Sequence, residues 1–247
     1  MIRAAGMAAV LLPLALAVPP AVAAPSVSFG IELGVVSRDI EEEGGLQGGT
    51  VSSIVDSTRL TARVSVALAP GVTLFGEAGG ADLAMTDEGY RSDMHLSYGG
   101  GIRLASGDPA YPRHPSVFAD LRVNRVATDD QLMLDWCDDS TCATSTARLS
   151  EEDLSWTEYA VGLGVMGRVQ GLRPFGGVQF SKLDGADRAR AIDGSANEAR
   201  LDVRESNSVG FFFGADLPLD RSERRLITIR FSGIDDNAFR VAYTVAF

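Results

Sequence analysis

The chain has 247 residues, 45% of them hydrophobic and 22% charged, enough to bury the core of one large β domain or two small ones. This composition excludes a disordered chain, and two Cys and two His leave little room for a zinc site. With 22 Lys and Arg against 33 Asp and Glu, the net charge of −11 argues against a general nucleic-acid binder, because phosphate contacts need a basic face.

The first 23 residues have the pattern of an export signal. Arg3 gives a positive start, residues 4–17 are apolar apart from one proline, and two further prolines precede the small-x-small sequence Ala21-Val22-Ala23. We expect cleavage after this sequence, which gives a signal peptide at 1–23 and a mature domain at 24–247. An N-terminal anchor helix is the less favoured alternative, since the apolar run is shorter than the about 20 residues of a spanning helix.

From residue 27 onward, apolar and polar side chains alternate with a period of two, the pattern of strands with one apolar face. The expected strands occupy residues 27–35, 60–68, 72–78, 94–104, 117–123, 159–165, 173–181, 209–215, 227–231 and 239–247. The weakest alternation is in 72–78 and 173–181. Counting both segments gives ten strands, and eight is the alternative.

Alternation alone fits a soluble sandwich as well as a membrane barrel, but further features favour the barrel. Long connections at 39–56, 128–155 and 184–204 are separated by short ones such as 69–71 and 169–172, as in barrels with long external loops and short periplasmic turns. The polar face combines small residues with several arginines, which a sandwich core would not hold. The sequence therefore predicts a closed antiparallel up-and-down transmembrane β-barrel, an all-β fold.

The last nine residues, Phe239-Arg-Val-Ala-Tyr-Thr-Val-Ala-Phe247, resemble the C-terminal strand of Gram-negative outer-membrane β-barrels. Segments 173–180 and 209–217 also resemble strands of opacity-protein and OmpA-like barrels. The resemblance implies a location in the cell outer membrane, with lipid and lipopolysaccharide around the barrel and both termini in the periplasm. It also implies that the barrel-assembly machinery reads Phe239, Tyr243 and Phe247 during biogenesis.

The polar face carries charged side chains in mid-strand, and their parity directs them into the lumen. They are Glu32, Arg63, Glu77, Arg103, Asp120, Arg122, Arg230 and Arg240. An interior of eight to ten strands is just wide enough for side chains, and buried charges must pair or stay hydrated. We expect a charge network that largely plugs the lumen, with Glu32 near Arg63, Arg63 near Glu77, and Arg240 approaching Glu32 where the ring closes.

The predicted loops contain two cysteines and several acidic runs. Cys137 and Cys142 are four residues apart, and in an oxidising compartment we expect a disulfide that braces the loop between them. The acidic runs are 41–43, 129–130, 138–139 and 151–153. We interpret them as solvated loop surfaces in preference to Ca²⁺ or Mg²⁺ sites, and we expect no metal or other cofactor.

His95 and Ser97 share one face of a strand and resemble the His-x-Ser pair of outer-membrane lipid A deacylases, with Glu77 as a candidate acid. The pair faces inward, whereas acyl-chain chemistry should face lipid, so we expect no catalytic site. The chain also lacks a motif of the omptin proteases, which are ten-stranded barrels with His and Asp pairs at the rim. We expect a structural or surface-binding role, with a small passive porin as the alternative and a barrel enzyme less favoured. The sequence leaves the oligomeric state open.

Overall fold

The computed structural model describes residues 26–44, 49–85, 90–106, 115–128, 131–135, 148–191, 198–206, 208–234 and 236–247. The expected signal peptide, Cys137, Cys142 and the acidic runs 129–130 and 138–139 lie outside these residues, so the expectations for them stay predictions. The described part of the chain contains no apolar helix of membrane-spanning length.

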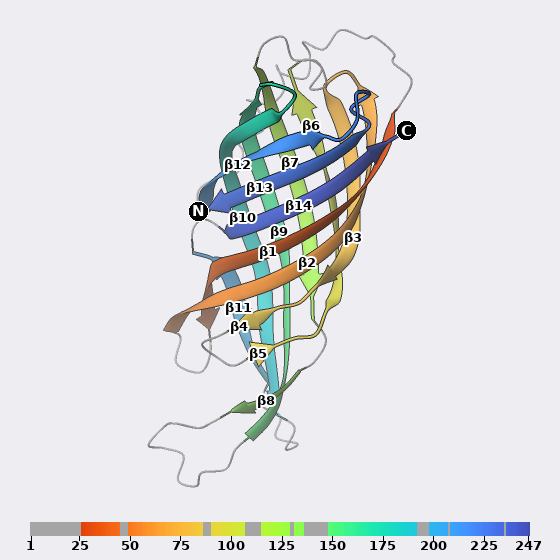
Figure 1. The fold of residues 1–247 in the computed structure, drawn as a ribbon. Helices are drawn as coiled ribbons and strands as arrows, with labels where there is room; N and C mark the ends of the chain where they lie inside the picture. The colour runs from red at the N-terminus through yellow and green to blue at the C-terminus, as the bar shows by residue number, and fades with distance from the viewer. Residues whose placement is uncertain are drawn as a thin grey trace.

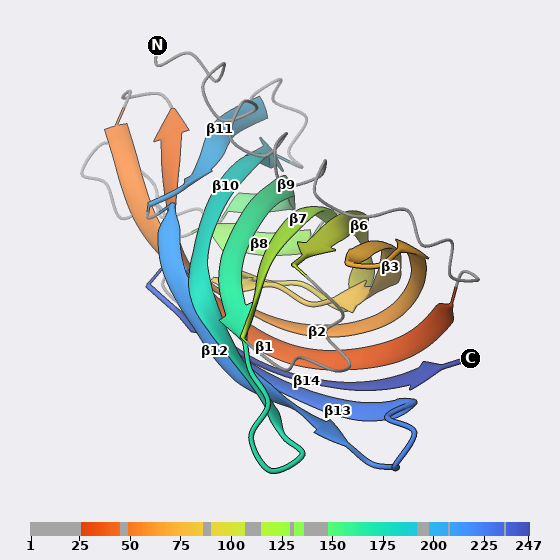
Figure 2. The same cartoon turned by 90° about the horizontal axis from the view of Figure 1, so that it is seen from above.

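The described residues form one antiparallel sheet that curves into a closed ring (Figures 1 and 2). Its strands are β1 (Val27–Gly44), β2 (Gly49–Ala69), β3 (Val72–Ala81), β4 (Ala84–Met85), β5 (Tyr90–Arg91), β6 (His95–Ala105), β7 (Ser116–Ala127), β8 (Gln131–Asp135), β9 (Arg148–Met166), β10 (Arg173–Ala191), β11 (Glu198–Glu205), β12 (Val209–Pro218), β13 (Arg225–Gly233) and β14 (Asn237–Ala246). Within the described ranges, ten of them form the barrel wall: β1, β2, β3, β6, β7, β9, β10, β12, β13 and β14. The ring closes where β1 pairs with β14, from Ser28 opposite Ala246 to Ser37 opposite Asn237. The predicted ten-stranded antiparallel barrel is confirmed, and the two weakly alternating segments lie in β3 and β10.

Apolar side chains point outward around the ring, on the faces that the alternation predicted. On β1, for example, Phe29, Ile31 and Leu33 are 42%, 48% and 54% exposed. We call this surface the apolar belt; it comprises Val27, Phe29, Ile31, Leu33, Val35, Leu60, Val64, Leu74, Leu96, Tyr98, Val117, Val123, Tyr159, Leu163, Val165, Val178, Phe211, Phe213, Phe231, Phe239 and Tyr243. A closed ring pairs every strand edge, and an apolar outer surface suits lipid, so this is the architecture of an outer-membrane β-barrel.

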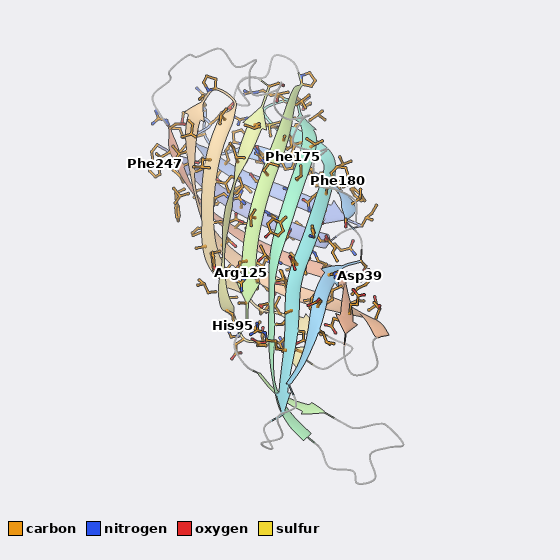
Figure 3. The ribbon with its side chains drawn as sticks, turned by 180° about the vertical axis from the view of Figure 1, so that it is seen from behind. Asp39, His95, Arg125, Phe175, Phe180 and Phe247 are labelled. Carbon is orange, nitrogen blue, oxygen red and sulfur yellow. The ribbon has the colours of Figure 1, made fainter. Side chains whose placement is uncertain are left out.

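The two ends of the barrel differ. The backbone N–H of Phe247 donates to the carbonyl of Val27 at 2.9 Å, so both ends of the described chain lie at one end, which we call the terminal rim. Figure 3 shows Phe175 and Phe247 toward this rim and His95 and Asp39 toward the opposite end, which we call the hairpin end.

At the hairpin end, the strands continue well past the residues that the alternation marked. β1 and β2 pair without a break from Val27 opposite Val66 to Gly44 opposite Gly49, so most of the predicted loop 39–56 is strand. In the same way β9 and β10 pair as far as Ser150 opposite Ala191, and β11 lies in the predicted loop 184–204. The predicted strand ends were wrong because the outward face meets water beyond the belt, where alternation with apolar residues is no longer needed. The acidic runs 41–43 and 151–153 accordingly lie in β1 and β9, not in loops.

Toward the hairpin end, additional strands continue the wall beyond the ends of its shorter strands. β12, β13 and β14 have 10, 9 and 10 residues, against 18 in β1 and 19 in β10. Beyond their ends β11 pairs with β10 on one side and with β1 on the other, with Asp184 opposite Arg204 and Ile40 opposite Glu205. β4 pairs with β2 and β5 with β4, while β8 pairs with the outermost part of β9 (Figure 1).

Gly177 and Gly76 offer a matched test of how closely the strands approach. A Cβ added to Gly177 would overlap the backbone carbonyl of Leu163, whereas one added to Gly76 meets nothing within 4 Å. We expect Gly177→Ala to lower the free energy of unfolding by about 1–3 kcal/mol through overpacking, and Gly76→Ala to leave it nearly unchanged. Urea titrations of the heat-modifiable gel shift measure both variants, and equal midpoints would contradict the close approach.

Candidate functional site

Inward-facing side chains fill the lumen in three successive layers. Along β7, from the terminal rim to the hairpin end, the inward residues are first aromatic, then charged and then apolar: Phe118, Asp120, Arg122, Asn124 and Val126. β9 runs the other way and repeats the order, from Met166 at the rim through Glu158 to Trp156 and Leu154. We call the three levels the aromatic layer, the ionic layer and the apolar layer.

Glu158 lies at the centre of the ionic layer, and its side chain is 1% exposed. Its Oε1 accepts hydrogen bonds from Arg38 at 3.3 Å and Arg122 at 3.1 Å. Its Oε2 accepts one from Arg59 at 3.4 Å. One carboxylate on β9 therefore links β1, β2 and β7, since each strand contributes one of the three arginines.

Asp236 is a second shared carboxylate, on the connection between β13 and β14, and it is fully buried. It accepts a hydrogen bond from Arg240 at 3.0 Å and lies 3.6 Å from Arg38. Arg38 also lies 3.7 Å from Glu205 at the end of β11. Arg38 therefore joins Glu158 and Asp236 into one network. The same arginine extends this network to β11, the strand that continues the wall beyond β12, β13 and β14.

Two cross-strand pairs lie nearer the terminal rim. Arg63 on β2 is directly opposite Glu77 on β3, and its Nη2 and Nε donate to Glu77 Oε2 at 2.6 and 3.0 Å. Arg103 on β6 is directly opposite Asp120 on β7, and it donates to both carboxylate oxygens at 2.6 and 2.7 Å. The second contact is a bidentate pair, the geometry in which guanidinium–carboxylate hydrogen bonds are strongest.

The ionic and aromatic layers meet through arginines stacked on rings. The guanidinium carbons of Arg63, Arg103 and Arg230 lie 4.7, 5.0 and 4.3 Å from the ring centroids of Phe75, Phe118 and Phe212. These are cation–π distances, so the ring faces stabilise the positive charge of the three arginines in addition to any ion pairs they form.

The structure brings together most of the charged residues that parity assigned to the lumen, but two expected pairs do not form. Glu32 is opposite Thr61, and Arg63 is opposite Gly30, so Arg63 is turned to Glu77 instead. Arg240 is opposite Gly34, and its carboxylate partner is Asp236. Register explains both outcomes, because Arg63 on β2 and Arg240 on β14 each lie two residues from the position directly opposite Glu32.

Sequence reasoning missed the centre of the network. Arg38, Arg59 and Glu158 have the same parity as the predicted lumen residues but lie just outside the segments taken as strands. Extending the alternation by one to three residues would have found them. Asp236 and Glu205 lie at strand ends or in a connection, where alternation carries no signal.

His95 and Ser97 both lie on the inner face of β6, opposite Ala81 and Gly79. Glu77 is opposite Gly99, four residues or about 13 Å along the strand from the level of His95, and Arg63 binds it. Glu77 therefore does not complete a Ser–His–acid triad. Among the residues that the structure describes, no group of three His, Cys, Asp or Glu side chains is arranged to hold a metal ion.

The aromatic residues of the last strand lie on the outside of the barrel. Phe239, Tyr243 and Phe247 are 44%, 43% and 76% exposed, and the ring of Phe239 lies 4.9 Å from that of Phe231. This places them in or beside the apolar belt. Their recognition by an assembly machinery stays a prediction.

No protein-family model and no curated protein matches this chain. Among solved structures, it is similar to the outer membrane protease OmpT from Escherichia coli, with 11% identity, a TM-score of 0.48, and 90% of this chain and 94% of that chain covered. The translocator domain of the autotransporter NalP from Neisseria meningitidis gives 12% identity, a TM-score of 0.45 and coverage of 97% and 94%. The attachment invasion locus protein Ail of Yersinia pestis, solved in complex with the heparin analogue sucrose octasulfate, gives 9% identity and a TM-score of 0.33, with 90% of this chain and 97% of that chain covered. With identities of 9–12% and TM-scores below 0.5, these matches carry no argument about this chain.

Separate replacement of Glu158 and Glu77 compares the stability contribution of a carboxylate shared by three arginines with that of a carboxylate paired with one arginine. Glu158→Gln leaves three buried arginines without their common counter-ion, so we expect it to lower the free energy of unfolding by about 3 kcal/mol or more. Glu77→Gln should cost clearly less, because the side chain of its partner Arg63 is 32% exposed and stays partly hydrated. Unfolding midpoints in detergent measure both, and a Glu77→Gln loss as large as that of Glu158→Gln would contradict this ranking.

Proposed function

We propose that this protein is an outer-membrane barrel with a structural or surface-binding role, whose lumen is closed toward the hairpin end. The observation that carries the proposal is the apolar layer. It consists of Ile40, Val55, Ala81, Leu83, Met85, Tyr90, Val126, Leu154, Trp156, Leu183 and Val203, each no more than 3% exposed. A passive porin needs a continuous aqueous path, and a packed apolar layer across the lumen interrupts it.

The hollows between the apolar layer and the terminal rim also support a lumen that is closed toward the hairpin end. The hollow between Arg59, Glu77 and Arg122 in the ionic layer measures about 20 Å³, close to the volume that one water molecule requires. The wider cavity, about 340 Å³, lies toward the terminal rim. The lumen is thus widest at the rim and narrows toward the hairpin end, where the plug combines ion pairs with apolar packing.

The segment between β3 and β6 supplies much of the plug. The N–H of Leu83 donates to the hydroxyl of Ser92 at 2.9 Å, which holds the β4–β5 hairpin together. The hydroxyls of Tyr90 and Thr128 lie 2.8 Å apart, and Thr128 donates to the carbonyl of Leu154 at 3.1 Å. These buried hydrogen bonds fasten the hairpin to β7 and β9, so the plug belongs to the folded wall.

The hairpin end also offers a charged surface for contacts outside the membrane. β1 and β2 extend past the apolar belt, and Asp39, Glu41 and Glu43 are exposed there. Glu43 pairs with Arg204 of β11 at 2.8 Å, although both side chains remain more than half exposed. Paired strands present these charges on a rigid frame, which favours a surface-binding role.

Conductance separates the closed barrel from the passive porin. We expect the refolded wild type to show no steady ohmic conductance in a planar bilayer, because the apolar layer excludes water. The double variant Leu83→Ala/Met85→Ala removes two plug side chains and should raise the frequency of open events. Leu33→Ala, on the belt, is the matched control and should behave as the wild type. Steady wild-type conductance would instead establish the porin alternative.

A further inference from the structure

The cavity at the terminal rim, which we call the rim cavity, has the size of a small-molecule site. It measures about 340 Å³, and its walls include Arg103, Phe118, Arg173, Phe175, Phe212 and Arg230. A hollow of about 110 Å³ shares Arg63, Arg103 and Arg230 with it. Known ligand pockets measure about 300–1,000 Å³, so the rim cavity has sufficient volume. Its walls combine three phenylalanines with more polar and charged groups than most such pockets carry.

Positive charge outweighs negative charge in the walls of this cavity. Its walls include six arginines but only two acidic residues, Glu32 and Asp216. Within the described residues, Arg63, Arg103, Arg122, Arg173 and Arg240 each have a carboxylate partner. Of the six arginines, Arg230 is therefore the one whose positive charge has no ion-paired carboxylate among the described residues.

Arg230 makes one hydrogen bond and one ring contact. Its Nη2 donates to the neutral Gln179 at 2.7 Å, and its guanidinium lies over Phe212. Its Nε is buried and has no hydrogen-bond partner among the described residues, and none of their carboxylates forms an ion pair with it. Arg230 thus lines the cavity as a cation without an ion-paired carboxylate, and an oxyanion bound beside it in the cavity would supply that counter-charge.

Three phenylalanines form the main apolar part of the cavity wall. Phe118, Phe175 and Phe212 pack together, with the Phe212 centroid 6.0 Å from that of Phe118 and 6.4 Å from that of Phe175. Met166 belongs to the same cluster. Arg230 stacks on this cluster, so a cationic donor and an apolar wall meet at one point.

The cavity reaches the terminal rim. Ser28, Leu226 and Thr244 line it, and each lies one or two residues from the strand end at that rim. The apolar layer blocks the other direction. Because the wall is a closed ring, a ligand reaches the cavity from the aqueous side of the rim and leaves by the same way.

We propose that the rim cavity binds a small soluble organic oxyanion, a carboxylate or phosphate ester with an apolar body. The oxyanion group binds Arg230 beside Arg103 and Arg63, and the apolar body packs on Phe118, Phe175 and Phe212. The site is a dead-end binding pocket. Oxyanion binding depends on the rim cavity and not on the plug, so it stands independently of the role proposed for the hairpin end. Only the absence of a second exit rests on the plug.

Equilibrium dialysis of the refolded full chain in neutral detergent tests the proposal, with phenyl phosphate as the probe. We expect saturable binding of one phenyl phosphate per barrel, weaker binding of inorganic phosphate, which lacks the apolar body, and weakest binding of benzyl alcohol, which lacks the charge. Added salt should weaken phenyl phosphate binding.

Arg230→Gln should weaken phenyl phosphate binding by about tenfold, since it removes one charge-assisted contact. Arg225→Gln is the matched control, because Arg225 lies on the same strand at the rim with a side chain that is 63% exposed. The heat-modifiable gel shift verifies folding of each variant. Ser65→Glu provides a second route: it adds a carboxylate to the cavity wall without removing an arginine, and it should also reduce binding.

Three results would each overturn the proposal: no saturable binding of phenyl phosphate, benzyl alcohol binding as tightly as phenyl phosphate, or undiminished binding by both Arg230→Gln and Ser65→Glu. None of them depends on conductance, so the binding site and the closed lumen can fail separately.

Discussion

Backbone hydrogen bonds between β1 and β14 form the seam that closes the sheet into a ring. Lipid offers no hydrogen-bond partners, so an unpaired strand edge is not tolerated in a membrane, and the sheet must close on itself. Pairing from Ser28 to Ser37 of β1 closes it. Closure also assigns every side chain to one side of the wall, so the apolar positions become the belt and the alternate positions fill the lumen.

Closure creates an electrostatic problem that the ionic layer resolves. Charges enclosed in the lumen cannot all be hydrated, so most of them are neutralised by a neighbour. Glu158 neutralises arginines from three strands, while Asp236 serves Arg38 and Arg240. The network therefore braces the barrel across its interior. It also divides the lumen into a packed part at the hairpin end and the open rim cavity, which gives the two ends different chemistry.

Much of this architecture could be predicted from period-two alternation, because the belt requires it wherever the wall meets lipid. The alternation in β1 and β14 gave both the strands and the correct outward faces. It could not give the register, which places Arg63 and Arg240 two residues from the positions opposite Glu32. Neither arginine forms an ion pair with Glu32 among the described residues, while Arg63 and Glu77 do meet.

The apolar layer and the shared carboxylates were beyond sequence reasoning for a different reason. Past the belt, both faces of a strand meet water or the packed interior, so alternation stops marking strands, as at Ile40 and Leu183. Asp236 comes from a connection whose position depends on the completed ring. Such residues become recognisable only when strands distant in sequence are brought together.

The lumen is packed at the hairpin end and open at the terminal rim. Thiol labelling tests this arrangement most directly, with Thr73→Cys in the rim cavity and Leu183→Cys in the apolar layer, each in a background with Cys137→Ser and Cys142→Ser. We expect a water-soluble thiol reagent to label Thr73→Cys in the folded barrel and to reach Leu183→Cys only after unfolding. Labelling of both positions at the same rate in the folded barrel would contradict it.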